Sequence, residues 1–336
     1  MKNLMNNTPL SRRDILKATA ATALTPLITS LNPLSLAAKA PMLGTHTPDH
    51  YRFKLGNFEV TTIVDSEVFI DGPYPIIGKN ASEAAVTKLM RENLLPEKKF
   101  QPGFTPTIIN TGKELILFDT GNGEDGFVKR PNGGWLAEKL KPAGFKPEDI
   151  DIVILTHGHP DHIGGLLEGG KPLCPNARYV IGETEHNYWI KDNDHTGFLK
   201  EAAALYRKSV KPVMEKFTFI KPGDEITSGI TAIKSHGHTP GHLSYHIDGG
   251  SEKILFWGDC AHHHVASLEA PDWHCVFDID KNTAANTRKT IFDMAATDKL
   301  AVIGFHMPFP SIGYVEAKGA SGYQWVPHSF QLTNES

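Results

Sequence analysis

A short apolar segment that runs directly into a cluster of histidines constrains this sequence more than any other feature. Residues 151–156 read DIVILT, which is typical of a strand buried on both faces. The next six residues, 157–162, contain three histidines and one aspartate. Imidazole and carboxylate groups in this mixture suit zinc, and they also suit manganese, iron or cobalt. The segment therefore predicts a metal site at the carboxyl end of a buried strand.

The remaining hydrophobic pattern predicts two strand-rich halves, each followed by helices. This order indicates an α/β fold in which two sheets pack face to face with helices outside. We expect strands at 58–65, 105–111, 114–119, 151–156, 179–182, 217–221, 230–235, 243–248, 253–258 and 300–305, and helices at 132–141, 183–190, 197–213 and 282–296.

The first forty residues differ from the rest and predict an export signal. Ser11-Arg12-Arg13-Asp14-Ile15-Leu16-Lys17 resembles the twin-arginine export signal, and an apolar stretch follows it. Pro26 and Pro33 argue against a stable membrane helix in that stretch. We therefore expect a signal and linker at 1–40, a single domain at 41–336, and a periplasmic or secreted protein.

Charge and cysteine content exclude several classes of protein. The formal net charge is −4, and no block of Lys or Arg interrupts the body of the chain. Nucleic acid is therefore not an expected partner. Three cysteines are too few for a disulfide framework or a cysteine-rich zinc module, and they allow one disulfide at most.

The histidine cluster and three later segments together resemble the motifs of the metallo-β-lactamase superfamily. The pattern His-x-His-x-Asp-His at 157–162 is similar to its signature. Thr239-Pro240-Gly241-His242, Trp257-Gly258-Asp259 and Gly304-Phe305-His306 are similar to its next motifs, in the same order. Asp119-Thr120-Gly121 resembles an early motif whose aspartate supports the ligands without binding metal. This resemblance implies the αββα sandwich of the superfamily, with two mixed sheets.

The same resemblance implies a site for two divalent metal ions, most commonly zinc. The implied ligands are His157, His159 and His242 for the first ion, Asp161, His162 and His306 for the second, and Asp259 as a bridge between them. Metal coordination lowers the pKa of water from about 15.7 to near 7, so a bridging hydroxide would be the nucleophile. We therefore expect hydrolysis of an ester-like bond, with Asp259 and Asp161 as central catalytic carboxylates.

Departures from the class B β-lactamases point to another branch. Those enzymes usually carry a cysteine where this chain has Asp259, and many lack a histidine at the place of His162. Residues 56–60, 235–242 and 309–313 are instead similar to secreted methyl parathion hydrolases and their lactonase relatives. That group implies a homodimer acting on small lactones or aryl esters, with phosphotriester hydrolysis as a related activity.

Four further residues are candidates for contact with the substrate. His262 stands three residues after Asp259, where acyl-homoserine lactonases often carry a tyrosine, and it could donate a hydrogen bond or carry a proton. The alternative is that His262 caps a strand end or faces solvent. Phe127, Trp189 and Phe198 are expected to line an aromatic pocket, although core packing is equally compatible with Trp189.

Two other functions share parts of this pattern. A thioester hydrolase of the glyoxalase II type would use the same ligands, but it usually adds a C-terminal helical region with basic groups. Residues 313–336 instead predict strands and a tail. A non-catalytic periplasmic zinc-binding protein is the second alternative, and a ligand set that leaves a bridging position open argues against it.

Overall fold

Two seven-stranded β-sheets form the framework of the protein in the computed structural model, which describes residues 40, 42–191 and 195–329. Both sheets belong to one compact unit, Thr47–Ser336. Apart from Ala40, the predicted export signal lies outside the described residues. Within the described part of the chain, no helix is both long and apolar enough to cross a membrane.

The first sheet is mixed, with an antiparallel half and a parallel half. Its strand order is β1-β2-β5-β6-β7-β10-β11, and the pairs β6/β7, β7/β10 and β10/β11 are parallel. The strands are β1 (His50–Leu55), β2 (Phe58–Ile63), β5 (Thr107–Asn110), β6 (Leu115–Phe118), β7 (Ile152–Ile154), β10 (Arg178–Gly182) and β11 (Phe217–Ile220).

The second sheet is mixed as well, with a single parallel pair, β15/β16. Its strands follow one another in chain order from β12 to β18. They are β12 (Glu225–Thr227), β13 (Ile230–Lys234), β14 (Leu243–Asp248), β15 (Lys253–Phe256), β16 (Ala301–Ile303), β17 (Ile312–Lys318) and β18 (Gly322–Pro327). The predicted C-terminal strands are thus present as β17 and β18. Two short antiparallel pairs complete the strands: β3 (Ile70–Asp71) with β4 (Lys99–Phe100), and the hairpin of β8 (Leu167–Glu168) and β9 (Lys171–Pro172).

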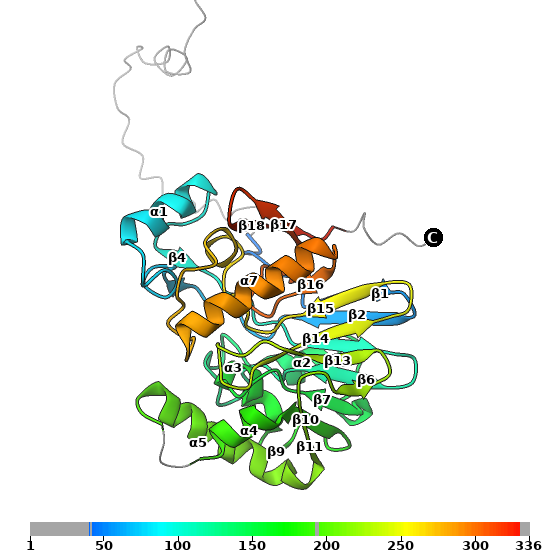
Figure 1. Ribbon diagram of the computed structural model, residues 1–336. Helices are drawn as coiled ribbons and strands as arrows, with labels where there is room; N and C mark the ends of the chain where they lie inside the picture. Colours follow the sequence, from blue (N-terminus) through cyan, green and yellow to red (C-terminus); the bar gives the residue numbers. More distant parts are fainter. Residues whose placement is uncertain (1–39, 41, 192–194, 330–336) are drawn as a thin grey trace, which may run out of the picture. The chain divides into compact units, whose positions relative to one another are not determined.

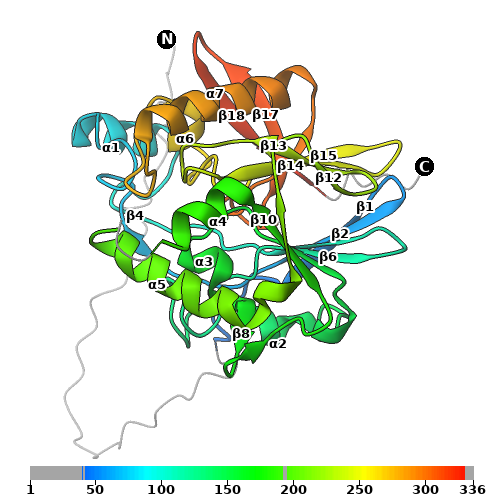
Figure 2. The same ribbon diagram turned by 60° about the horizontal axis from the view of Figure 1, so that its bottom comes forward.

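Helices cover the outer faces of both sheets. In Figures 1 and 2, α7 lies on one side of the two sheets and α4 and α5 lie on the other. The α-helices are α1 (Glu83–Glu92), α2 (Leu136–Leu140), α3 (Pro160–Ile163), α4 (Glu183–Trp189), α5 (Phe198–Val210), α6 (Ala266–Glu269) and α7 (Lys281–Thr297). Side chains cap two of them, because Ser82 accepts the N–H of Ala85 in α1 and Asp280 accepts that of Thr283 in α7.

The alternation of side chains along the central strands explains the layers. In β7, Ile152 and Ile154 enter the core between the sheets, while Val153 enters the core under the outer helices. In β15, Phe256 enters the core between the sheets and Leu255 packs beneath α7. Each strand is apolar on both faces and is therefore buried on both faces. The predicted αββα sandwich is confirmed.

The predicted elements differ from the observed ones mainly at their ends and in one region. Most strands begin or end one or two residues inside the predicted ranges, and the helix predicted at 132–141 covers only Leu136–Leu140. The segment between β2 and β5 contains α1 and the antiparallel pair of β3 and β4, which the sequence pattern did not predict. The strands β1, β8, β9 and β12 were not predicted either. All three cysteines are buried and free, so they form no disulfide in this structure.

Strand direction gathers five loops at one edge of the sandwich. In the first sheet, the parallel strands β6 and β7 end beside each other, which brings the loops at Asp119 and at residues 156–162 together. In the second sheet, β13, β15 and β16 all run in the same direction. The loops that follow them, at 235–242, 257–264 and 304–311, therefore emerge at one end of the second sheet.

Candidate metal centre

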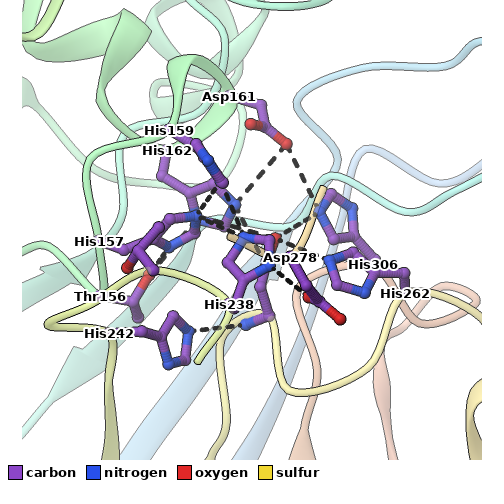
Figure 3. Close-up of polar contacts among 12 residues, drawn as sticks. Thr156, His157, His159, Asp161, His162, His238, His242, His262, Asp278 and His306 are labelled. Atoms are coloured by element: carbon purple, nitrogen blue, oxygen red, sulfur yellow. Dashed lines mark hydrogen bonds and ion pairs between the residues drawn. The ribbon is translucent and has the colours of Figure 1, made fainter. Parts of the chain in front are cut away.

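The loop after β7 presents the histidine cluster because Pro160 starts a short helix there. Proline is favoured at the first helical position, and α3 begins at Pro160 with His159 as its N-cap. His157 and His159 therefore lie on the loop, while Asp161 and His162 lie in the first turn of α3. His157 and His162 are fully buried. The loop thus directs four polar side chains toward the loops of the second sheet (Figure 3).

Three imidazole nitrogens form the first cluster. Nε2 of His157 lies 3.0 Å from Nδ1 of His159, which in turn lies 2.8 Å from Nε2 of His238. The His238 and His157 Nε2 atoms are 3.2 Å apart. Asp259 Oδ2 lies 3.3 Å from His238 Nε2. Ligand atoms about 2 Å from one zinc ion in a tetrahedral arrangement are about 3.3 Å apart, so these spacings fit a shared metal ion.

His238 occupies the position in this cluster that we predicted for His242. Nε2 of His242 accepts a hydrogen bond from the backbone N–H of Asp259 at 3.0 Å. Its Nδ1 lies 2.8 Å from the Ser235 hydroxyl. Both ring nitrogens of His242 therefore have partners in the protein, whereas Nε2 of His238 faces the other ligands. We correct the predicted ligand set by replacing His242 with His238.

The second cluster contains the other three predicted ligands. Nε2 of His306 lies 3.5 Å from Asp161 Oδ2, and Nε2 of His162 lies 3.7 Å from the same oxygen. Asp259 connects the two clusters, because its Oδ1 lies 3.2 Å from His162 Nε2 and its Oδ2 lies 3.1 Å from His306 Nε2. The structure therefore brings Asp161, His162, Asp259 and His306 together as the sequence predicted.

Buried polar atoms without partners show that this donor set fits a cation. Within the described residues, Nε2 of His162 and Oδ1 of Asp259 are buried and have no hydrogen-bond partner. Such atoms are costly to bury unless something else binds them. Burial and the neighbouring histidines hold the pKa values of His157 and His159 well below the usual range, which keeps both neutral. Neutral imidazole is the form that binds metal.

A carboxylate and a carbonyl behind the second cluster orient its two histidine rings. Asp119, at a positive φ of 56° after β6, places Oδ2 2.8 Å from Nδ1 of His162. This agrees with the supporting role expected for Asp119. The carbonyl of Gly103 lies 2.7 Å from Nδ1 of His306. Contacts of this kind fix the ring orientation of metal-binding histidines.

The support behind His238 was missed by the sequence interpretation. Asp278 Oδ1 lies 2.9 Å from Nδ1 of His238, and the Arg288 guanidinium donates to Asp278 Oδ2 at 3.0 Å. Arg288 also donates to the carbonyls of Cys260 and Pro271. A signal for Arg288 does exist, since it lies on the buried face of α7, where an arginine requires a partner. Asp278 gives no comparable local signal.

An apolar cavity opens over the two clusters. His159, Asp161, Asp259 and His306 reach its surface, and no Lys or Arg is among the described residues that line it. The apolar wall includes Ile70, Ile76, Phe100, Phe104, Phe127, Phe198 and Phe277. Several of these side chains come from the unpredicted segment between β2 and β5, which therefore forms part of the cavity.

The candidate substrate residues separate into those that line the cavity and one that does not. Phe127 and Phe198 line it and are both partly exposed, at 42% and 46%. Trp189 does not line it: its side chain is fully buried, and its indole N–H donates to Glu185. The pocket role of Trp189 is therefore corrected to core packing, because the ring lies against the backbone of Gly158.

His262 lies in the wall of the cavity beside Asp259. Its Nε2 is 3.5 Å from Asp259 Oδ2, and its ring stacks on that of His306 with 5.5 Å between centroids. Both ring nitrogens are buried without a hydrogen-bond partner among the described residues. His262 therefore does not face solvent, in contrast to the alternative that the sequence left open.

A family model of the metallo-β-lactamase superfamily matches residues 105–296, which is more than half of the chain. The chain belongs to this superfamily, and lactonases are among its relatives and structural neighbours. This agrees with the resemblance drawn from the four motifs.

Two solved structures cover most of the chain. AidC, a dizinc quorum-quenching lactonase in complex with a product, is 27% identical with a TM-score of 0.78, and the match covers 84% of this chain and 98% of AidC. AbOPH, a hydrolase in the β-lactamase superfamily, is 28% identical with a TM-score of 0.79, covering 85% of this chain and 99% of AbOPH.

Matches to curated proteins are shorter. A probable metallo-hydrolase of Mycobacterium tuberculosis is 25% identical over 178 residues, covering 46% of this chain and 56% of the relative. The N-acyl homoserine lactonase AttM of Agrobacterium fabrum is 27% identical over 124 residues, covering 35% of this chain and 43% of the relative. The chain thus spans about half the length of the curated relatives it matches.

Proposed function

We propose that this protein is an exported hydrolase with two zinc ions that cleaves lactones or aryl esters. One observation carries the proposal: two His/Asp clusters share the carboxylate of Asp259 on the surface of a cavity whose remaining wall is apolar apart from His262. His157, His159 and His238 would hold one ion, and Asp161, His162 and His306 the other. When bound, zinc ions at this spacing would lower the pKa of water and polarise a carbonyl oxygen.

The residues of the chain would divide the remaining work between them. Asp259 and Asp161 line the cavity and would hold the ions at its surface. His262 would donate a hydrogen bond or proton to the carbonyl or leaving oxygen of the substrate, because its ring lines the cavity and its buried nitrogens have no hydrogen-bond partner among the described residues. The surrounding apolar wall excludes water from the reacting ester.

The lining of the cavity favours neutral, apolar substrates. A lactone with an acyl chain, an aryl ester or a neutral phosphotriester could bury its apolar part against Phe127 and Phe198. A glutathione thioester carries carboxylates that would need cationic partners, and the described lining residues provide no Lys or Arg. This argues against the glyoxalase II type of activity.

Export and dimerisation are further parts of the proposal. The twin-arginine-type sequence at 11–17 supports transfer of the folded protein to the periplasm or beyond. The resemblance to methyl parathion hydrolases and lactonases supports a homodimer. Export is tested by the double variant Arg12→Lys, Arg13→Lys, which should remain in the cytoplasm. The homodimer is tested by light scattering of the purified protein, which should give twice the mass of one chain.

Hydrolysis of a substrate panel tests the activity. We would measure turnover of N-acyl homoserine lactones, aryl esters, methyl paraoxon, a glutathione thioester and nitrocefin, with metal content measured alongside. We expect lactone or aryl ester turnover with two zinc ions per chain, and its loss in Asp259→Ala. Turnover of the thioester alone would contradict the proposed substrate class, and bound zinc without any turnover would indicate a binding protein.

A further inference from the structure

A buried carboxylate connects the two loops that carry the first cluster, and the proposed reaction does not use it. Glu185, in α4, is fully buried. Its Oε1 accepts hydrogen bonds from the backbone N–H of Gly158 at 2.9 Å and from the indole N–H of Trp189 at 2.5 Å. Its Oε2 accepts from the hydroxyl of Thr239 at 2.7 Å and from the backbone N–H of Gly241 at 2.9 Å.

These partners lie directly beside metal-site residues. Gly158 separates His157 from His159, and Thr239 follows His238. The two oxygens of one side chain therefore bind one loop from each sheet. The packing around them is close: a Cβ on Gly158 would lie 2.4 Å from Trp189 Cδ1.

The hydrogen bonds of Glu185 make it a rigid connection. Burial raises its pKa, and the four donors oppose that rise. Replacing one carboxylate oxygen by an amide nitrogen would turn an acceptor into a donor and leave a buried N–H facing other donors without a partner. The nearest cluster residues to these hydrogen bonds in sequence are His157, His159 and His238, whereas the rings of His162 and His306 are oriented by Asp119 and by the carbonyl of Gly103.

We propose that Glu185 is a positioning residue for the first metal ion. By fixing the loop at 156–162 to the loop at 235–242, it holds His157, His159 and His238 at the spacing of shared ligands. Loss of this connection weakens binding of one ion and leaves the other nearly unchanged. The inference rests on the two-metal site proposed above.

Metal titration of the purified protein tests this role. Wild type and Glu185→Gln would be stripped with a chelator and titrated with Zn²⁺ against a competing chromophoric chelator. We expect two sites in wild type. In Glu185→Gln we expect one site of wild-type affinity and one weakened about 10–100-fold. Titration of the metal-free proteins with Co²⁺ provides a second readout. In Glu185→Gln, the absorption of the weakened site should appear only after the other site has filled.

Two further variants separate positioning from general stability. Thr239→Val removes one of the four donors at nearly constant volume and should weaken the same site less than Glu185→Gln, which keeps the test open if Glu185→Gln does not fold. Asp65→Asn is the control, because Asp65 is equally buried but accepts from Asn122 and Leu136 instead. It should lower the Tm of the metal-free protein without changing the ratio of the two affinities.

Three results would overturn the inference. Unchanged zinc affinities in both Glu185→Gln and Thr239→Val would show that the connection is not needed. Equal weakening of both sites, as a general loss of stability would give, would remove the positioning role. Fewer than two zinc ions in wild type would overturn the proposed metal site itself, and this inference with it.

Discussion

At the scale of single residues, the partners of the two ring nitrogens decide which histidine can bind metal: one nitrogen must remain free for the ion. His238 and His242 lie four residues apart in one loop, and both are buried. Nδ1 of His238 contacts the carboxylate of Asp278, which leaves Nε2 directed at the other ligands. His242 uses Nε2 to accept the N–H of Asp259 and thus supports the bridging residue through its backbone.

Alanine substitutions at these two histidines should therefore differ. We expect His238→Ala to lose one of two zinc ions and to lower kcat/KM by more than about 100-fold, beyond the usual effect of a supporting residue. His242→Ala should keep two ions at saturating zinc and lose less activity. Metal analysis and steady-state kinetics of both variants check this, and loss of one ion only in His242→Ala would reverse our assignment.

At the scale of elements, α7 supplies the cation behind the first cluster. Its buried face is mainly apolar, including Ile291 and Phe292, and Arg288 lies on the same face. The guanidinium neutralises Asp278, which is also buried. A buried ion pair of this kind stabilises the fold little more than well-packed apolar side chains of similar volume would. Removing only one partner is costly, because it leaves a buried charge.

A double-mutant cycle tests this pairing. Arg288→Met should destabilise the metal-free protein by about 3–5 kcal/mol, because the buried Asp278 would lose its cationic partner and keep only the contact with His238. The double variant Arg288→Met, Asp278→Asn should be less destabilised than the sum of the two single variants. Urea unfolding of the metal-free proteins gives these values. Additive effects would show that the two side chains do not interact.

The turn before α6 contains a histidine that makes stability depend on pH. Nδ1 of His263 accepts the N–H groups of Val265 and Ala266 at 3.0 and 3.1 Å. Burial, with a contribution from His264, lowers the pKa of His263 to about 3. Between that value and the unfolded value of about 6.5, the unfolded chain binds more protons, so this contribution to stability is present above pH 6.5 and is lost as pH falls.

Replacing this histidine should flatten the pH profile. His263→Asn keeps an acceptor near the position of Nδ1 but cannot titrate. We expect the free energy of unfolding of the metal-free variant to fall less steeply than that of wild type from pH 6.5 to pH 4. The two slopes should differ by up to about 1.4 kcal/mol per pH unit. Urea unfolding across this range measures the slope, and identical slopes in variant and wild type would refute the assignment.

At the scale of the whole molecule, both halves of the sandwich contribute to the metal centre. The loop after β7 in the first sheet supplies four of the proposed ligands, and loops of the second sheet supply His238, Asp259 and His306. Metal ions bound here would connect the two sheets. Without them, imidazoles and carboxylates remain crowded together, and some of their buried atoms have no hydrogen-bond partner among the described residues.

Metal removal should therefore reduce both stability and activity. A metal ion whose free concentration is 100 times its Kd stabilises the folded state by about 2.7 kcal/mol. We expect chelation to lower Tm by several degrees and to abolish hydrolysis, and we expect added Zn²⁺ to restore both. Differential scanning fluorimetry with parallel assays measures this. A Tm that does not respond to chelator or zinc would contradict a metal centre between the sheets.

The sequence by itself determined the sandwich and most of the proposed site. Strands such as 151–156 are apolar on both faces, so they can only be central strands, and the spacing of His157, His159, Asp161 and His162 is local. Short-range pattern, together with the resemblance of four motifs to one superfamily, therefore sufficed for these features. The tertiary structure decided between His238 and His242, placed Trp189 in the core, and brought Glu185, Asp278 and Arg288 behind the ligands. These outcomes depend on contacts between loops far apart in sequence, and no local periodicity encodes such contacts.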